Sequence, residues 1–516
     1  MKKHNIFILG IMSLATVGLT GCGEGFLDVE SPTSDDVNEY YTTDEHIQEA
    51  LTASYDPLHW ADWGNGNYAP INLCSDIMSD DCYPGGGSAS DMLNWQLIFN
   101  FKATAENTLE SLWIDEYSGV KRCNDLIGYV DKALATQGSD LTQEHAESYT
   151  AQARVLRDYY YMILWKFWGN IPYFTQNLSG DYKAPQLKAD EIYANIITDL
   201  EDVLDKYGSA LPMKASSGNE GRVTKAFAYM VYAELVMYQN DESRYPKALG
   251  YMNEIIQSGQ YALNPDFKAM WAEGGEWCSE SIYEINYDDN NHLRGWSSPL
   301  AVGGTVLPRL LGPRGWTSGA AGVDNGWGFG PVRHAIYDMY SGQDVRRDVS
   351  IFDADKVAKE NGITYEAGYM NTGLFQGKYL PLVENVKDAG WDADLNFNNN
   401  LRVYRYAETL LNAAELLLRT NGDNSTALKY VNMLRKRAGI ANLTTVNLDA
   451  IVNERHLEFL GEGKRYWDLV RTGKAATTLV PDEEGNRTAS WTESKKYLPI
   501  PQSELSADPN LQQNDY

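Results

Sequence analysis

The residues best suited to bind a ligand gather between Asn291 and Pro331, where glycine and tryptophan recur. Trp296, Trp316 and Trp327 each follow a glycine, and this 41-residue stretch has no sustained helical or strand period. An indole ring can stack on the apolar C–H face of a sugar ring. Loops of this length are usually functional or disordered, and disordered segments are poor in aromatic residues. We therefore predict an ordered recognition surface; tryptophans that merely fill a loop-rich core are the simpler alternative.

Three polar side chains can supply hydrogen bonds to sugar hydroxyls beside these rings. Asp80 and Asp81 lie in a loop-like segment near the N-terminal end, and Arg294 lies two residues before Trp296. Acidic residues in loops are usually only solvated, so a role unrelated to ligand binding is the alternative for both aspartates.

The chain is acidic overall, with a formal net charge of −28. This excess disfavours binding of nucleic acid through a general basic face. The region between Asn291 and His334 is less acidic than the rest, because four arginines there face a single aspartate. These residues are Arg294, Arg309, Arg314, Arg333 and Asp324. The local balance leaves room for an anionic group on the ligand.

The sequence offers no positive case for catalysis. It lacks a Gly-x-Ser-x-Gly elbow, a phosphate-binding loop and a metal-binding triad, and its seven histidines form no recognisable set. A glycosidase needs two carboxylates at a set separation, but among 71 acidic residues such pairs arise by chance. We therefore expect a protein that is not an enzyme and that needs no cofactor or metal.

One group of acidic residues resembles a catalytic set and has a simpler explanation. Glu454, Glu458 and Glu462 share one face of a predicted helix. The basic residues beside them are Arg455, Lys464 and Arg465. Because opposite charges at helical spacing attract one another, we interpret the group as a structural ion-pair network.

The first residues have the pattern of an export signal. Two lysines precede the apolar run Ile6–Val17, which is too short and too interrupted to span a bilayer as a helix. The tetrapeptide Leu19–Cys22 resembles the bacterial lipoprotein cleavage box. We therefore expect removal of residues 1–21, lipid on Cys22 and a tether over residues 22–37. Several acyl chains on one terminus anchor a protein stably, whereas one chain does not.

Two further cysteines lie close together in the chain. Cys74 and Cys82 are eight residues apart in a loop-like segment. Exported proteins can form disulfides, so we expect a bridge that closes this loop, with reduced buried thiols as the alternative. Cys123 lies on the apolar side of a predicted helix and is expected in the core. No CxxC pair or histidine-rich spacing suggests zinc.

Most of the remaining chain is predicted to be helical, because apolar residues recur at helical spacing. The clearest helices are Ala105–Ala135, Glu144–Trp168, Lys225–Tyr238, Tyr406–Arg419 and Leu448–Leu460. Paired helices joined by short turns are typical of tetratricopeptide-like units, which bury their faces only by stacking. We therefore predict one mostly α-helical domain over residues 38–516, with a scaffold of about 38–260 and 401–475. The loop-rich segment 261–400 is expected to pack against it as a ligand-binding insert.

Several motifs together resemble a known family. They are Ala151–Phe174, Gly221–Ala226, Arg405–Arg419, Asn432–Gly439, Asn453–Lys474, Tyr497–Pro501 and Pro509–Tyr516. With the Phe-Leu-Asp tripeptide that follows the cleavage box, they resemble the SusD/RagB family of outer-membrane lipoproteins of Bacteroidetes. The resemblance runs from the cleavage box to the last residue.

The resemblance implies a SusD-like fold with four tetratricopeptide-like helix pairs and an irregular ligand-binding region. It implies a lipid-anchored protein at the cell exterior that covers a SusC-like TonB-dependent transporter and hands it oligosaccharides. Starch-binding members hold glycan on an arc of aromatic residues. The aromatic residues of this sequence that correspond best to the positions of that arc are Tyr83, Trp296 and Trp327. Trp316 has no clear family counterpart. The binding loops vary between members, so the resemblance does not name the sugar.

Two other functions remain open at the level of sequence. The first keeps the role as a transporter lid and changes the cargo to peptide or another nutrient. The second is a helical-repeat scaffold that binds only protein, with the tryptophans in the core. The tryptophan-rich loop and the lack of a basic face favour a neutral or mildly anionic glycan.

Overall fold

A computed structural model of the chain describes residues 37–64, 66–289 and 293–516. The expected leader, the lipidated Cys22 and the tether up to residue 36 lie outside the described residues. Within these ranges the protein is mostly α-helical, which confirms the predicted fold class. No helix among the described residues combines the length and the apolar character needed to cross a membrane.

The α-helices vary from single turns to seven-turn rods. They are α1 (Val37–Tyr40), α2 (Asp44–Tyr55), α3 (Pro57–Trp60), α4 (Ile71–Met78), α5 (Leu93–Phe99), α6 (Glu110–Ala135), α7 (Gln143–Trp168), α8 (Ala189–Tyr207), α9 (Lys225–Gln239), α10 (Tyr245–Gln257), α11 (Leu307–Leu311), α12 (His334–Met339), α13 (Arg347–Ser350), α14 (Ala354–Asn361), α15 (Tyr406–Arg419), α16 (Asn424–Arg437), α17 (Leu448–Phe459), α18 (Arg465–Arg471), α19 (Ala475–Thr478) and α20 (Gln502–Ala507).

The strands of the described residues are short and form three two-stranded antiparallel sheets. They are β1 (Ile171–Pro172) with β2 (Gln186–Leu187), β3 (Ser281–Ile285) with β6 (Leu401–Arg405), and β4 (Ile351–Asp353) with β5 (Leu374–Gln376). The β3–β6 pair has the clearest structural role. It joins the two ends of the segment 286–400, so this segment leaves the helical part of the chain and returns to it at one place.

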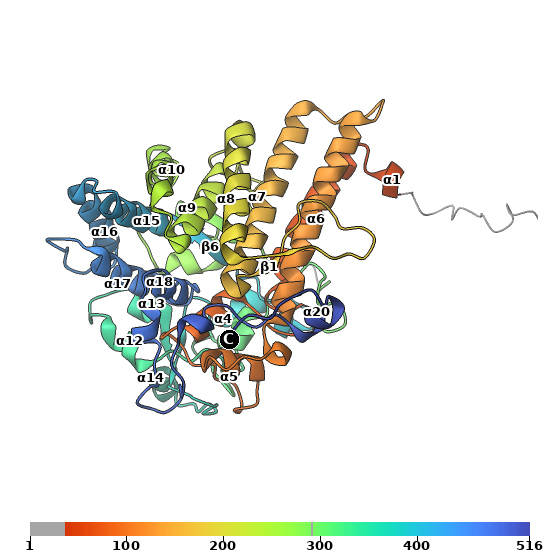
Figure 1. The fold of residues 1–516 in the computed structure, drawn as a ribbon. Coiled ribbons are helices and arrows are strands. Elements are labelled where there is room, and N and C mark those ends of the chain that lie inside the picture. Colours follow the sequence, from red (N-terminus) through yellow and green to blue (C-terminus); the bar gives the residue numbers. More distant parts are fainter. Residues whose placement is uncertain (1–36, 65, 290–292) are drawn as a thin grey trace, which may run out of the picture.

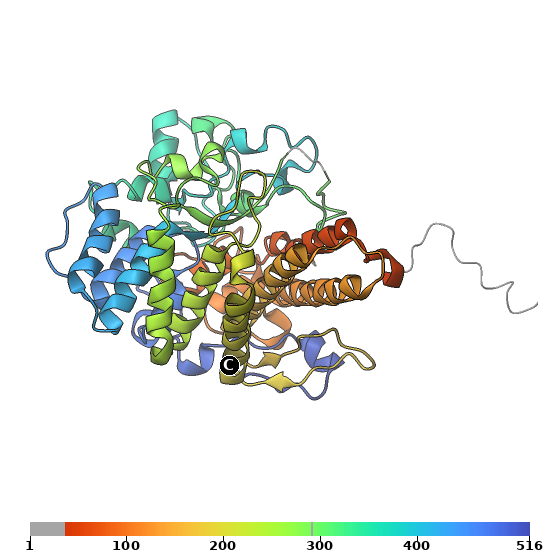
Figure 2. The same ribbon diagram turned by 90° about the horizontal axis from the view of Figure 1, so that it is seen from above.

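Successive long helices pack side by side in one curved row. In Figure 1 this row runs from the orange α6 and α7 through α8, α9 and α10 to the blue α15 and α16, and Figure 2 shows it from above. Helix α10 packs directly against α15, although 148 residues separate the end of one from the start of the other. The segment between them contains no α-helix longer than the eight residues of α14 among its described residues.

Helix α7 shows how local sequence sets the elements of the row. The Thr142 side chain caps its N-terminus by accepting a hydrogen bond from the His145 N–H at 3.1 Å. The helix ends at Gly169, whose φ of 66° suits glycine, and a Cβ there would lie 2.6 Å from the Tyr497 ring. Its second half is buried on all sides, which fits a helix with neighbours on both flanks. The predicted span of this helix, 144–168, is correct to one residue.

A buried ion-pair network joins the helical row to the loop-rich segment. The guanidinium of Arg405, at the end of β6, lies 2.5 Å from Glu280, 3.0 Å from Glu458 and 2.7 Å from Glu462. Arg437 also pairs with Glu280 and Glu458. Arg346 and Lys378, from the loop-rich segment, bind the same group of glutamates. Nearly all of these side chains are fully buried, so each charge depends on its partners.

The network confirms that Glu454, Glu458 and Glu462 have a structural role, and it corrects the partners expected for them. Arg455 pairs with Glu408 and Asp468, Lys464 pairs with Glu408, and Arg465 pairs with Asp80. The actual partners of the three glutamates come from α16, β6 and the loop-rich segment. Folding brings these cations from distant parts of the chain, so spacing along one helix does not reveal them.

We expect Arg405→Met to lower the free energy of unfolding by about 3–5 kcal/mol, because it leaves buried glutamates without their shared cation. Urea denaturation followed by circular dichroism measures this change. Lys206→Met is the control, since the Lys206–Asp202 pair is exposed and should change stability by less than about 0.5 kcal/mol. Equal effects of the two substitutions would contradict a structural role for the network.

The protein should lose stability as the pH falls from about 5 towards 2. Burial raises the pKa of Asp468, but Arg455 and Arg471 outweigh it and hold that pKa at about 2. Burial likewise raises the pKa of Glu234, and Lys166 and Lys464 bring it to about 2. Unfolded carboxyl groups bind protons near pH 4, so acid favours the unfolded chain across this window. Thermal melting from pH 7 to pH 3 tests this, and a constant melting temperature below pH 5 would contradict it.

Candidate functional site

Two of the three tryptophans singled out in the sequence meet at the surface. The rings of Trp296 and Trp327 are nearly parallel, with centroids 6.3 Å apart and planes inclined by 23°. Trp63 meets Trp296 edge-on at 4.9 Å, and Tyr68 meets Trp327 edge-on at 5.7 Å. The Trp296 side chain is 44% exposed and Trp327 is half-buried. These four residues form the aromatic cluster of the candidate site.

Close approaches between backbone segments place Trp327. Gly326 lies so near Gly312 that a Cβ on it would be 2.2 Å from the Gly312 carbonyl group. The Trp327 N–H donates to the carbonyl oxygen of Arg309 at 2.8 Å. A side chain at position 326 would therefore push Trp327 away from α11, which explains the need for glycine before this tryptophan.

Buried charge fixes the loop that carries Trp296. The Arg294 guanidinium is buried and donates to the Asp62 carboxylate at 2.6 and 3.1 Å. It also donates to the carbonyl oxygens of Trp63 at 2.7 Å and Gly304 at 2.6 Å. The prediction that Arg294 binds ligand is therefore wrong, because its donors are already used inside the protein. Its role is to hold the Trp296 loop against the Trp63 segment.

A polar cavity of about 650 Å³ opens beside Trp327. Its wall includes Tyr68, Asp91, Arg314, Asn325 and Glu366. The Arg314 guanidinium donates to the Glu366 carboxylate at 2.9 Å, and both side chains remain largely exposed. The cavity thus places hydrogen-bond donors and acceptors next to an aromatic surface, as a sugar-binding site requires.

Tyr68 is the main residue of this site that the sequence prediction missed. Burial raises its pKa to about 12, and the nearby carboxylates of Asp394 and Asp62 act in the same direction. The phenol therefore keeps its proton at neutral pH and can donate a hydrogen bond. In the sequence, the aromatic residues clustered between Trp60 and Tyr68 could have indicated this part of the site. They belong to the loop that follows α3.

Tyr83 and Trp316 are not part of this surface, which corrects their prediction as glycan platforms. Tyr83 is only 2% exposed, packs against Phe99 and lies under the guanidinium of Arg333. Trp316 is only 3% exposed and belongs to a small core cluster with Phe352 at an edge-on distance of 5.4 Å. For Trp316 the simpler alternative, a ring that fills the core, is correct.

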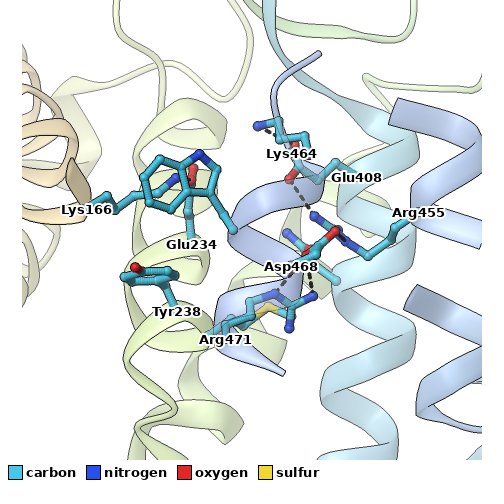
Figure 3. Close-up of a pocket in the computed structure, with 11 residues that line it drawn as sticks. Lys166, Glu234, Tyr238, Glu408, Arg455, Lys464, Asp468 and Arg471 are labelled. Carbon is cyan, nitrogen blue, oxygen red and sulfur yellow. Dashed lines mark hydrogen bonds and ion pairs between the residues drawn. The ribbon is translucent and has the colours of Figure 1, made fainter. Parts of the chain in front are cut away.

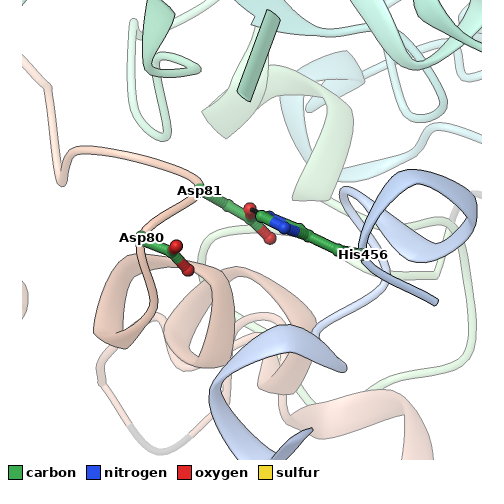
Figure 4. Close-up of side chains that lie close together, drawn as sticks. All are labelled: Asp80, Asp81 and His456. Carbon is green, nitrogen blue, oxygen red and sulfur yellow. Dashed lines mark hydrogen bonds and ion pairs between the residues drawn. The ribbon is translucent and has the colours of Figure 1, made fainter. Parts of the chain in front are cut away.

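Asp81 and Asp80 also have partners within the protein; Figure 4 shows the two aspartates beside His456, the partner of Asp81. Asp81 is buried, and its Oδ1 lies 2.5 Å from Nε2 of His456 on α17. Both oxygens of Asp80 accept hydrogen bonds from the Arg465 guanidinium, at 2.8 and 3.0 Å. The side-chain atoms of Asp80, Asp81 and His456 that could coordinate a metal ion lie within 4.8 Å of one another. Because both carboxylates are engaged, the group forms a structural junction, and the prediction that Asp81 contacts glycan is wrong.

Cys74 and Cys82 are free thiols, which corrects the expected disulfide. Both side chains are completely buried, Cys74 on α4 and Cys82 just after it. Burial raises the pKa of both thiols. The Cys82 sulfur instead accepts a hydrogen bond from the Gln376 amide at 3.3 Å. Cys123 is buried in α6, as predicted.

The arginines of the tryptophan-rich stretch are all matched by acidic side chains. Their pairs are Arg294 with Asp62, Arg309 with Asp324 and Asp394, Arg314 with Glu366, and Arg333 with Asp482. Four of these five carboxylate partners lie outside the stretch, so counting charges within it overstates its positive charge. The expected room for an anionic ligand group is therefore not present.

A second, charged cavity lies between the helices of the row (Figure 3). Its accessible volume is about 30 Å³, enough for one or two water molecules. Lys166 pairs with Glu234, and Arg471 pairs with Glu415 and Asp468. This cavity is too small for a sugar, and its charges neutralise one another, so it belongs to the scaffold.

Several solved proteins that resemble this chain are described as glycan-binding proteins. The surface glycan-binding protein A from Bacteroides thetaiotaomicron, solved in complex with laminarihexaose, is 51% identical in sequence. Its structure matches with a TM-score of 0.87, covering 92% of this chain and 100% of that one. A laminarin-binding SusD-like protein is 29% identical, with a TM-score of 0.80 and coverage of 92% and 99%.

More distant relatives extend over the whole chain. The SusD-like protein P2 from Formosa agariphila is 24% identical, and the alignment covers 100% of this chain and 99% of the relative. The sequence pattern of the SusD family matches residues 60–516, which include every residue of the aromatic cluster. This chain therefore belongs to the SusD family.

Proposed function

We propose that this protein captures a β-glucan of the laminarin type on the cell surface, without catalysing a reaction. The observation that carries the proposal is the pair of near-parallel indoles, Trp296 and Trp327, beside a polar cavity. Laminarihexaose is a chain of six glucose units, and the relative solved with it shares about half of its residues with this chain. The alignment covers 92% of this chain and 100% of that relative, which supports the same class of ligand here.

The aromatic cluster is suited to the weak, reversible binding that capture requires. Each indole platform buries roughly 50–80 Å² of apolar surface against a sugar, worth about 1–2 kcal/mol. Subtracting the cost of association leaves a dissociation constant on the order of tens of micromolar to millimolar. Such a complex holds a passing chain and releases it to the next component.

The charges of the cavity favour a neutral sugar. Arg314 and Glu366 face one another at 2.9 Å and neutralise each other, and the Asp91 carboxylate leaves the wall slightly acidic. A neutral hydroxyl can accept a hydrogen bond from the guanidinium and donate one to the carboxylate. A uronic acid or sulfated sugar would instead meet Glu366 and Asp91 without a free cation to balance them.

We infer that the protein delivers its glycan to a SusC-like TonB-dependent transporter in the outer membrane. Membership of the SusD family and the cleavage box at Leu19–Cys22 support this part of the proposal. The lipid on Cys22 would hold the protein at the membrane, since the acidic chain has little attraction for an anionic surface.

We expect laminarin to retard the protein in native affinity electrophoresis more strongly than starch, fructan, xylan, mannan or pectin. Trp296→Ala should weaken this retardation about tenfold, because one stacking platform is lost. Its melting temperature should change little, since 44% of the Trp296 side chain is exposed.

Trp316→Ala is the matched control for this experiment. The buried Trp316 ring lies outside the site, so its loss should lower the melting temperature and leave the retardation unchanged. Retardation by starch alone would contradict the ligand class, and no retardation by any glycan would favour peptide cargo.

The anchor can be tested separately by radioactive palmitate labelling of cells that export lipoproteins. The wild-type protein should take up label and sediment with membranes, whereas Cys22→Ser should do neither. Cys278→Ser is the control, because Cys278 is a free, partly buried thiol whose loss leaves the cleavage box intact. Labelling that persists in Cys22→Ser would contradict the proposed anchor.

A further inference from the structure

A third exposed tryptophan lies next to the aromatic cluster. Trp391, which the sequence analysis did not single out, is 50% exposed. A Cβ built on Gly295 would lie 2.6 Å from the outer edge of the Trp391 indole. The edge of the indole therefore lies against the backbone of the residue that precedes Trp296, and half of the side chain is exposed to solvent.

Hydrogen bonds fix Trp391 relative to Trp296. The residue after it, Asp392, accepts a hydrogen bond from the Trp296 N–H at 3.1 Å. The Asn396 side chain donates to the carbonyl oxygens of Arg294 at 3.1 Å and Asp392 at 3.0 Å. Two of these hydrogen bonds join the 391–396 turn to the Trp296 loop, and the third, from Asn396 to Asp392, lies within the turn. The Trp296 loop is in turn anchored by the buried Arg294–Asp62 pair.

The turn that carries Trp391 includes a residue in the left-handed region. Asp392 has a φ of 50°, a conformation that aspartate adopts more readily than most residues other than glycine. Such a conformation persists only where the surrounding contacts enforce it. Here the contacts keep a large apolar ring at the surface, although burying it would be favourable.

We propose that Trp391 forms an outer sugar-binding platform that extends the Trp296–Trp327 site to longer glycan chains. This inference rests on the proposed function and names a further residue for it. A rigid aromatic ring at the edge of a sugar-binding cluster can stack on the next part of the same chain without new ordering of the protein. Short oligosaccharides occupy the inner platforms, and only longer chains reach Trp391.

Calorimetric titration of the purified protein with laminaritriose and laminarihexaose tests this subsite. Wild-type protein should bind the hexaose more tightly than the triose. Trp391→Ala should lower the affinity for laminarihexaose about fivefold to tenfold and change that for the triose less than about twofold. Trp391→Phe should restore most of the loss, because a smaller aromatic ring still stacks.

Two control variants keep the outcomes distinct. Trp296→Ala should weaken both oligosaccharides, and Tyr182→Ala, which removes an exposed aromatic ring from a separate cavity, should weaken neither. Equal losses for triose and hexaose in Trp391→Ala would overturn the outer platform and assign Trp391 to positioning Trp296. An unchanged affinity for the hexaose would also overturn it. Wild-type protein that binds neither oligosaccharide would overturn the β-glucan assignment and this subsite with it.

Discussion

Charge buried away from water must be paired, and this constraint organises the protein. Arg405 ends the strand β6 and meets glutamates from α17, from the α17–α18 turn and from the start of β3. Arg346 and Lys378 bring the loop-rich segment to the same glutamates. Because none of these charges can be left alone without a large penalty, the network holds the helical row and the loop-rich segment together.

The same principle fixes the candidate site at a smaller scale. Arg294 and Asp62 form a buried pair that joins two loops, and Trp63 and Trp296 project from those loops. Gly326 lets the backbone that carries Trp327 approach α11 closely. Aromatic rings on such rigid supports lose little entropy when they bind a ligand. The irregular segment therefore presents a preformed surface, although it contains little regular secondary structure.

The degree of burial distinguishes residues that fill the core from residues that form the surface site, which residue type alone does not. Trp316 and Trp296 both follow a glycine in the same stretch, yet Trp316 fills a core cluster and Trp296 is largely exposed. The two arginines likewise differ, since Arg314 lines an open cavity and Arg294 holds two loops together. A site formed by exposed rings and self-neutralised polar groups suits a neutral sugar chain better than a charged ligand.

The long helices, the core position of Cys123 and the family motifs can be predicted from the sequence alone, because helical periodicity and motif order are local properties. The sequence also located two surface tryptophans, Trp296 and Trp327. Only the tertiary structure decided that Tyr83 and Asp81 are buried, and that Arg294 is matched by an aspartate 232 residues away. Burial and ion pairing depend on contacts between distant segments, and spacing along the chain does not specify which segments meet.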